Sequence, residues 1–182
     1  MLIAQQQRKE NIAEYLLYMW QIEDLLRACS FDAEKIEMQL VRRFAVDENT
    51  QKEISRWYNN LSVMMENEHV QESGHLQVLV NLVDDLNEFH RKMLEVQVDK
   101  EYVRLYQSNS TAIAEIMQKA QLPVMNEVEA CLNALYGFML LKLKNSEISE
   151  QTQKSVQGLG RMIGHLSARY IQFENDDFTF DD

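Results

Sequence analysis

Apolar residues recur every three or four positions along almost the whole chain, which is the spacing of one face of an α-helix. Helix-capping residues and the pair Ser73-Gly74 stand between these runs, and no stretch alternates as a strand would. The pattern predicts seven helices, at about 9–28, 33–44, 50–69, 76–96, 99–117, 123–144 and 149–173. Because the connections are short, we expect an all-α fold, a single bundle of six or seven mostly antiparallel helices over residues 1–173.

Two positions bear on how these helices begin and run. The polar cluster at 108–111 is expected to kink or interrupt the helix 99–117, because each side chain can hydrogen-bond its own backbone. Pro123, the only proline, suits the first turn of the next helix, where its missing N–H costs nothing.

The composition excludes several classes of protein. Of the 182 residues, 46% are apolar or aromatic, enough to bury a core without disulfides or metal. The net charge of −11 disfavours nucleic acid and anionic membranes as partners. No apolar run approaches the ~20 residues of a membrane span, and no signal peptide is evident. With two cysteines outside any CxxC spacing, reduced thiols in a cytoplasmic protein are the simplest expectation.

The motifs of enzyme chemistry are weak, and we predict no catalytic residue, no metal and no cofactor. Glu72 and His75 have the Glu-x-x-His spacing of di-iron bundles, but they stand at a helix boundary next to Gly74. Arg161 and His165 are spaced somewhat like the catalytic pair of helical ribonucleases of the HEPN type, though only three residues intervene. A metal-dependent or ribonuclease-type enzyme is therefore the third hypothesis.

His90 is the one histidine that extends an apolar helix face into the expected core. A histidine in that position is usually a hydrogen-bonded structural residue. The alternative is a small-ligand pocket in which His90 meets tyrosines of other helices, with Tyr15, Tyr18 and Tyr136 as candidates.

Two groups of residues favour contacts with another chain. Leu17 and Trp20 lie off the main apolar stripe of the first helix, without obvious cover from the same chain. Gly160 and Gly164 leave a strip of the last helix almost bare, which in a soluble bundle more often admits a neighbouring helix of the same chain and is otherwise a candidate interface. We therefore expect a homodimer, or a complex with another protein.

The last nine residues, 174–182, differ in composition from the rest of the chain. They hold five acids and no base, with Phe178 and Phe180 one residue apart. Such a tail is either a solvated terminus or a docking segment whose two phenylalanines enter an apolar groove on the bundle itself or on a partner.

The opening segment 8–24, RKENIAEYLLYMWQIED, resembles the start of an uncharacterised all-α family of Bacteroidetes, a domain of unknown function. The resemblance implies a bacterial cytoplasmic protein of similar length and helical character. It implies no catalytic or binding residue.

Together these observations favour a non-catalytic module for protein–protein interaction or self-assembly. The alternative is a small-ligand-binding or regulatory bundle with its pocket near His90.

Overall fold

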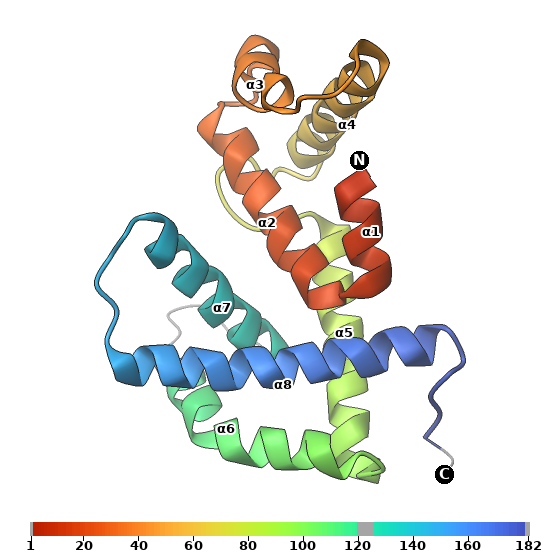
Figure 1. The fold of residues 1–182 in the computed structure, drawn as a ribbon, viewed down its shortest axis with the longest axis vertical. Coiled ribbons are helices and arrows are strands. Elements are labelled where there is room, and N and C mark those ends of the chain that lie inside the picture. The colour runs from red at the N-terminus through yellow and green to blue at the C-terminus, as the bar shows by residue number, and fades with distance from the viewer. Residues whose placement is uncertain (1, 120–125, 181–182) are drawn as a thin grey trace. The chain divides into compact units, whose positions relative to one another are not determined.

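The computed structural model describes residues 2–119 and 126–180, and this part of the chain forms α-helices without strands (Figure 1). The helices are α1 (Leu2–Glu10), α2 (Ile12–Ala28), α3 (Ala33–Gln39), α4 (Glu48–Asn67), α5 (Gln77–Val96), α6 (Lys100–Lys119), α7 (Glu127–Leu143) and α8 (Glu150–Glu174). The all-α class is confirmed. The expected count of six or seven is slightly too low for the described residues, which form eight α-helices.

The additional helix comes from the start of the chain, where one helix over 9–28 was expected. Asn11 separates α1 from α2, and its side-chain Oδ1 accepts hydrogen bonds from the backbone N–H groups of Ala13 (3.1 Å) and Glu14 (3.2 Å). This is the geometry of an N-cap, so Asn11 begins a new helix instead of continuing the first.

Two other helix boundaries differ from the expectation. The segment 33–44 forms the shorter α3, capped by Asp32, followed by a 3-10 helix over Val41–Arg43. α7 begins at Glu127, where the Asn126 side chain accepts a hydrogen bond from the N–H of Glu129 (2.7 Å). Pro123, the expected first-turn residue, lies outside the described residues.

The interruption expected at 108–111 was wrong, because α6 continues through these positions. The Ser108 hydroxyl donates to the carbonyl of Arg104 (2.8 Å), and the Asn109 amide donates to that of Leu105 (2.8 Å). These side chains therefore bond to carbonyls of the preceding helical turn and leave the helix intact.

The described residues divide into two compact units, the first drawn from 1–8 and 15–81 and the second from 9–14 and 82–182. In the first unit, Glu23 of α2 is buried and accepts hydrogen bonds at both carboxylate oxygens. His75 Nδ1 lies 2.5 Å from one oxygen, and the Leu76 N–H lies 2.9 Å from the other. Arg27 adds hydrogen bonds from its guanidinium to the carbonyls of Val70 and Gly74. The segment between α4 and α5 is thus held against α2 by side chains. The predicted division of the chain at residue 173 stays a prediction.

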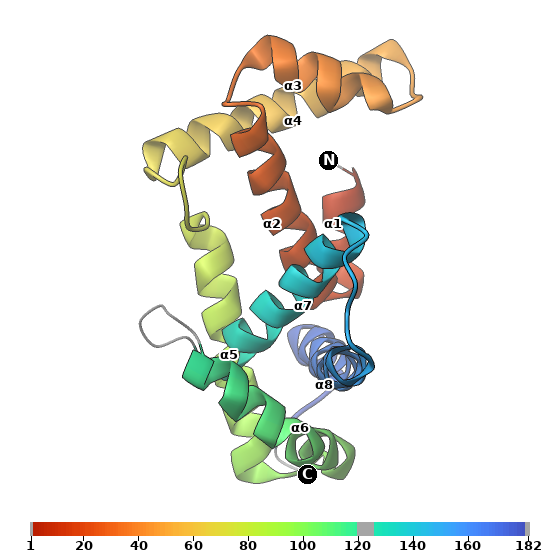
Figure 2. The ribbon, with the colours of Figure 1, turned by 90° about the vertical axis from the view of Figure 1, so that its left-hand side faces the viewer.

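The second unit is built around α8, which lies against α6 and α7 (Figures 1 and 2). α6 and α8 run antiparallel, because the residue before α6, Asp99, meets His165 and Arg169 while Asn109 meets Gly158. The core of this unit includes Leu86, Ile113, Leu132 and Leu166, each at most 1% exposed.

Candidate functional site

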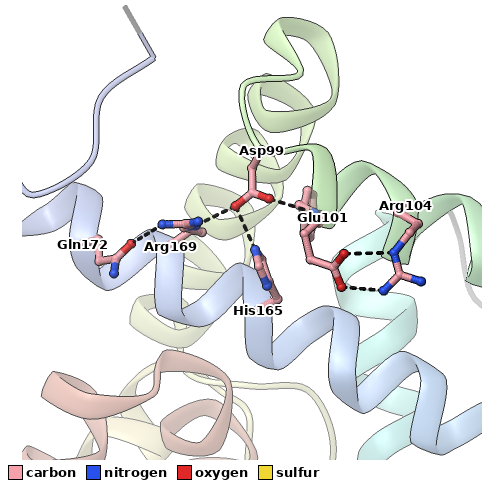
Figure 3. Close-up of polar contacts among 7 residues, drawn as sticks. Asp99, Glu101, Arg104, His165, Arg169 and Gln172 are labelled. Carbon is pink, nitrogen blue, oxygen red and sulfur yellow. Dashed lines mark hydrogen bonds and ion pairs between the residues drawn. The ribbon is translucent and has the colours of Figure 1, made fainter. Parts of the chain in front are cut away.

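The densest group of buried polar contacts in the second unit centres on Asp99 (Figure 3). One carboxylate oxygen of Asp99 accepts hydrogen bonds from His165 Nε2 (2.8 Å) and Arg169 Nε (2.6 Å), and the other accepts from the N–H of Tyr102 (2.9 Å). Arg169 also donates to the Gln172 side chain (2.9 Å). One carboxylate therefore caps α6 and holds α8 beside it.

The environment of Asp99 favours its ionised form. Burial alone would raise the pKa of this carboxyl, but hydrogen bonds from His165, Tyr102 and Arg169 outweigh that effect and lower it to about 2. The carboxylate is therefore charged throughout the physiological pH range.

His90 lies on the other side of Tyr102 and is 2% exposed. Its Nδ1 lies 2.5 Å from the Tyr102 hydroxyl and its Nε2 lies 3.0 Å from a carboxylate oxygen of Glu127. Tyr106 donates to the second oxygen of Glu127 (3.2 Å), and its ring lies 5.4 Å from that of His90. Tyr102, whose ring also stacks on His165, thus stands between the two histidines.

These partners differ from the tyrosines expected at His90. The structure places Tyr102 and Tyr106 there, both from α6. Tyr136 lies nine residues beyond Glu127 on α7, about 13 Å along the helix axis. Tyr15 and Tyr18 belong to the first unit.

The environment of His90 favours the neutral imidazole. Burial lowers the pKa of His90, and the carboxylate of Glu127 only partly offsets this effect. With both ring nitrogens bonded within the chain, His90 has the character of a structural histidine.

The glycines of α8 have different roles from those expected. A Cβ built on Gly158 would stand 2.3 Å from the Asn109 side-chain oxygen, so the close approach to α6 occurs at Gly158, which was not a candidate. Gly160 faces Leu135 of α7 at an ordinary 3.6 Å, and a Cβ on Gly164 would meet nothing within 4 Å. Neither candidate glycine marks a tight crossing within the second unit.

The interface candidates of the first unit are largely covered. Trp20 is 2% exposed and stacks on the His75 ring, with centroids 4.4 Å apart. Leu17 is half-buried. The expectation that Trp20 lacks cover from its own chain was wrong, because the segment after α4 brings His75 over it.

Glu72 and His75, the pair with the spacing of di-iron bundles, do not come together as ligands. His75 is engaged by Glu23, not by Glu72. Within residues 2–119 and 126–180, no group of three or more His, Cys, Asp or Glu side chains is placed to hold a metal ion.

The two cysteines are buried, and burial raises the pKa of both thiols, that of Cys131 to about 12. A nucleophilic cysteine requires the opposite shift. Arg161, the other half of the ribonuclease-like pair, is exposed, while His165 is bonded to Asp99.

Phe178 and Phe180 pack on the helices of their own unit. The ring of Phe89 on α5 lies 6.0 Å from that of Phe178 and 5.4 Å from that of Phe180, which is 9% exposed. Tyr170 and Phe173 of α8 complete the aromatic cluster around Phe89. Of the two expectations for the tail, docking on the chain itself therefore describes residues 178–180.

The residues missed from the sequence are Asp99, Tyr102, Glu127 and Arg169. Asp99 was expected only to open a helix, and Glu127 fell inside an expected helix. Their partners lie up to 70 residues away along the chain, so the pairing cannot be predicted from local residue spacing.

Within the described residues the fold is all-helical, and the polar clusters around Asp99 and His90 bond to partners within the same chain. Among the described residues, no helix has both the length and the apolar character needed to cross a bilayer. The chain belongs to the family described as a domain of unknown function (DUF4924), whose model matches residues 1–177. No curated protein and no solved structure was found to match it.

Proposed function

We propose that this protein is a non-catalytic interaction module that self-associates through the second half of α7. The observation that carries the proposal is the surface of residues 133–143, which are apolar on all sides of the helix except for Asn133 and Lys142. Most helices of water-soluble proteins are polar on the face away from the core. Residues 133–143 of α7 lack such a face.

Burial along α7 changes abruptly at its midpoint. Val128, Ala130, Cys131 and Leu132 are at most 1% exposed, as expected for a core helix. Every residue from 133 to 140 is only half-buried, and Leu141 and Leu143 are 43% and 63% exposed. A contiguous apolar surface of this kind is typical of an interaction site.

Two features favour a second copy of the chain as the partner. A symmetric dimer requires one surface to contact itself, and an apolar helix does so without placing like charges together. Gly137 lies near the centre of the stretch, and a Cβ there would meet nothing within 4 Å, so a second helix can approach the backbone. Lys142 lies near its end, with its ammonium over the Phe138 ring (4.8 Å), where it can stay in water.

The size of this surface sets the expected affinity. Eleven helical residues span about 16 Å, which is a small contact, so we expect dissociation in the micromolar range rather than an obligate dimer. A ligand pocket at His90 has less support, because both nitrogens of that ring are bonded to residues of the same chain.

Sedimentation equilibrium over a wide concentration range tests the proposal. The wild-type chain is expected to approach twice its monomer mass, and Leu141→Glu is expected to remain monomeric because the new carboxylate cannot be buried. Val63→Glu is the matched control, since Val63 is similarly exposed (53%) but lies on α4. A monomeric wild type at every concentration, or equal effects of the two variants, would contradict the proposal.

A further inference from the structure

A second surface, separate from residues 133–143 of α7, follows α5. Side chains of α5 between Asp85 and Val96 line a groove of about 1160 Å³, together with Tyr170 and Phe173 of α8. Its apolar lining includes Phe89, Val96 and Phe173. Val96 and Phe173 are 42% and 41% exposed, so part of this lining is open to solvent.

The segment after α8 already occupies one end of this groove. Phe180 lines it, with the Lys92 ammonium 4.3 Å from its ring centroid, and the Arg169 guanidinium lies 5.5 Å from the ring of Phe178. Phe180 lines the groove itself, and Phe178 packs on Phe89 next to it, so two aromatic side chains separated by one residue each lie beside a cation.

The attachment of this segment depends on its side chains. The last backbone bond that closes α8 joins the Asp177 N–H to the carbonyl of Gln172 (2.8 Å). Within the described part of the chain, no backbone hydrogen bond holds residues 178–180. A segment held in this way can leave the groove without unfolding a helix.

The charges of the groove do not match those of the segment. The acidic side chains that line the groove are Asp85, Glu88, Glu95 and Glu127, whereas Arg91 and Lys92 are its only basic ones within the described residues. The tail has five acids and no base. Glu88 is paired with Arg91 (3.0 Å) and Glu127 with His90 (3.0 Å), so Asp85 and Glu95 are the groove carboxylates that would repel an acidic tail.

We propose that the α5 groove is a docking site for a partner protein's segment with two aromatic residues separated by one residue and Lys or Arg on both sides. The chain's own Phe178 and Phe180 hold this site as a weak, displaceable occupant. A basic segment would keep the aromatic contacts and exchange repulsion for attraction to Asp85 and Glu95.

The effect of the tail on the affinity of a partner segment for the groove can be estimated. A short tether gives an effective concentration in the millimolar range, so a tail that binds with a dissociation constant of about 0.1 mM lowers the apparent affinity of a competitor about tenfold. Replacing both phenylalanines in the full chain removes this competition and leaves the helices in place.

The test uses three nine-residue peptides with the same Phe-Thr-Phe centre and acidic, neutral or basic flanks. They are titrated by isothermal calorimetry and by NMR into the full chain carrying Phe178→Ser and Phe180→Ser. We expect the basic peptide to bind most tightly and the acidic one least, with NMR shifts at Phe89 and Phe173. The wild type and the control Thr179→Ala are expected to bind about tenfold more weakly than the double variant.

Several results would overturn the proposal. If a basic peptide with Ser in place of both phenylalanines binds as tightly as the one with Phe-Thr-Phe, charge attraction alone accounts for binding. Equal affinity of the wild type and the double variant would show that the tail does not compete. Tightest binding by the acidic peptide would favour the tail of a second copy as the occupant. A double variant that keeps its helicity and melting temperature but binds none of the peptides would eliminate the docking site.

Discussion

Replacing Asp99 with Asn isolates the charge of the buried carboxylate in the second unit. Asn is similar in shape and is itself a good N-cap, so the bond to the N–H of Tyr102 can persist. The variant loses the negative charge that His165 and Arg169 share. Asp99→Ala loses the cap as well, which typically costs about 1 kcal/mol more.

The size of the charge effect follows from the pKa of Asp99. A shift from the ordinary 3.8 to about 2 corresponds to about 2 kcal/mol of folding free energy at neutral pH. Because the folded-state pKa is the lower one, this stabilisation is complete above pH 3.8. It is lost as the pH falls through 2, because below that pH the carboxyl is protonated in the folded state as well as in the unfolded state.

Urea unfolding followed by circular dichroism at several pH values measures this difference. Asp99→Asn is expected to be about 2 kcal/mol less stable than the wild type at pH 7, with the two converging near pH 2. Glu101→Gln is the matched control, since the Glu101–Arg104 pair is exposed and should contribute little (Figure 3). The role assigned to Asp99 would be refuted if wild type and Asp99→Asn had equal unfolding free energies at pH 7. It would also be refuted if their difference did not shrink as the pH is lowered to 2.

Three further predictions use the same unfolding measurements or simple chemistry. Gly158→Ala is expected to destabilise the protein by about 1–2 kcal/mol because the new Cβ overlaps Asn109. In an Asn109→Ala background the same substitution should stabilise the protein by up to about 1 kcal/mol. An effect of the same sign in both backgrounds would refute the close approach of Gly158 to Asn109. Burial lowers the pKa of His90, so stability due to His90 is present above pH 6.5 and lost as the pH falls below it. The wild type should therefore lose more stability than His90→Gln between pH 7.5 and 5.5, and parallel pH profiles would exclude this. Cys29 and Cys131 should resist alkylation in the native protein at pH 8 and react in urea, because both thiols are buried with raised pKa values; rapid reaction of the native thiols would contradict their placement.

The fold class and most helices could be predicted because they depend on local spacing. The expected helix 76–96 corresponds to α5 (Gln77–Val96), and 149–173 corresponds to α8 (Glu150–Glu174). The helix α1 was missed because the stretch QQQRKE contains no apolar residue to show a period. Several helix ends were also hard to predict. The left-handed backbone that ends a helix is usually formed by glycine, but here His69, Gln97 and Asn145 adopt it.

The candidate site could be predicted only in part. His90 was correctly placed on a buried face, because burial follows from helical periodicity. Its partners were not predicted, since Tyr102 and Glu127 reach it through the packing of α5, α6 and α7, which the spacing along any one helix does not encode. Trp20 was assigned to an interface for a similar reason, because its cover comes from His75, which lies between two helices.

The distance along the chain between Asp99 and its partners also affects how the second unit is made. His165 and Arg169 follow Asp99 by 66 and 70 residues. At a synthesis rate of about 5–20 residues per second, the ribosome adds Arg169 roughly 4–14 s after Asp99. During that interval the start of α6 has a carboxylate without its two side-chain partners, and the faces of α6 and α7 that α8 covers stay open. A nascent chain at this stage offers chaperones a surface that the finished protein no longer has.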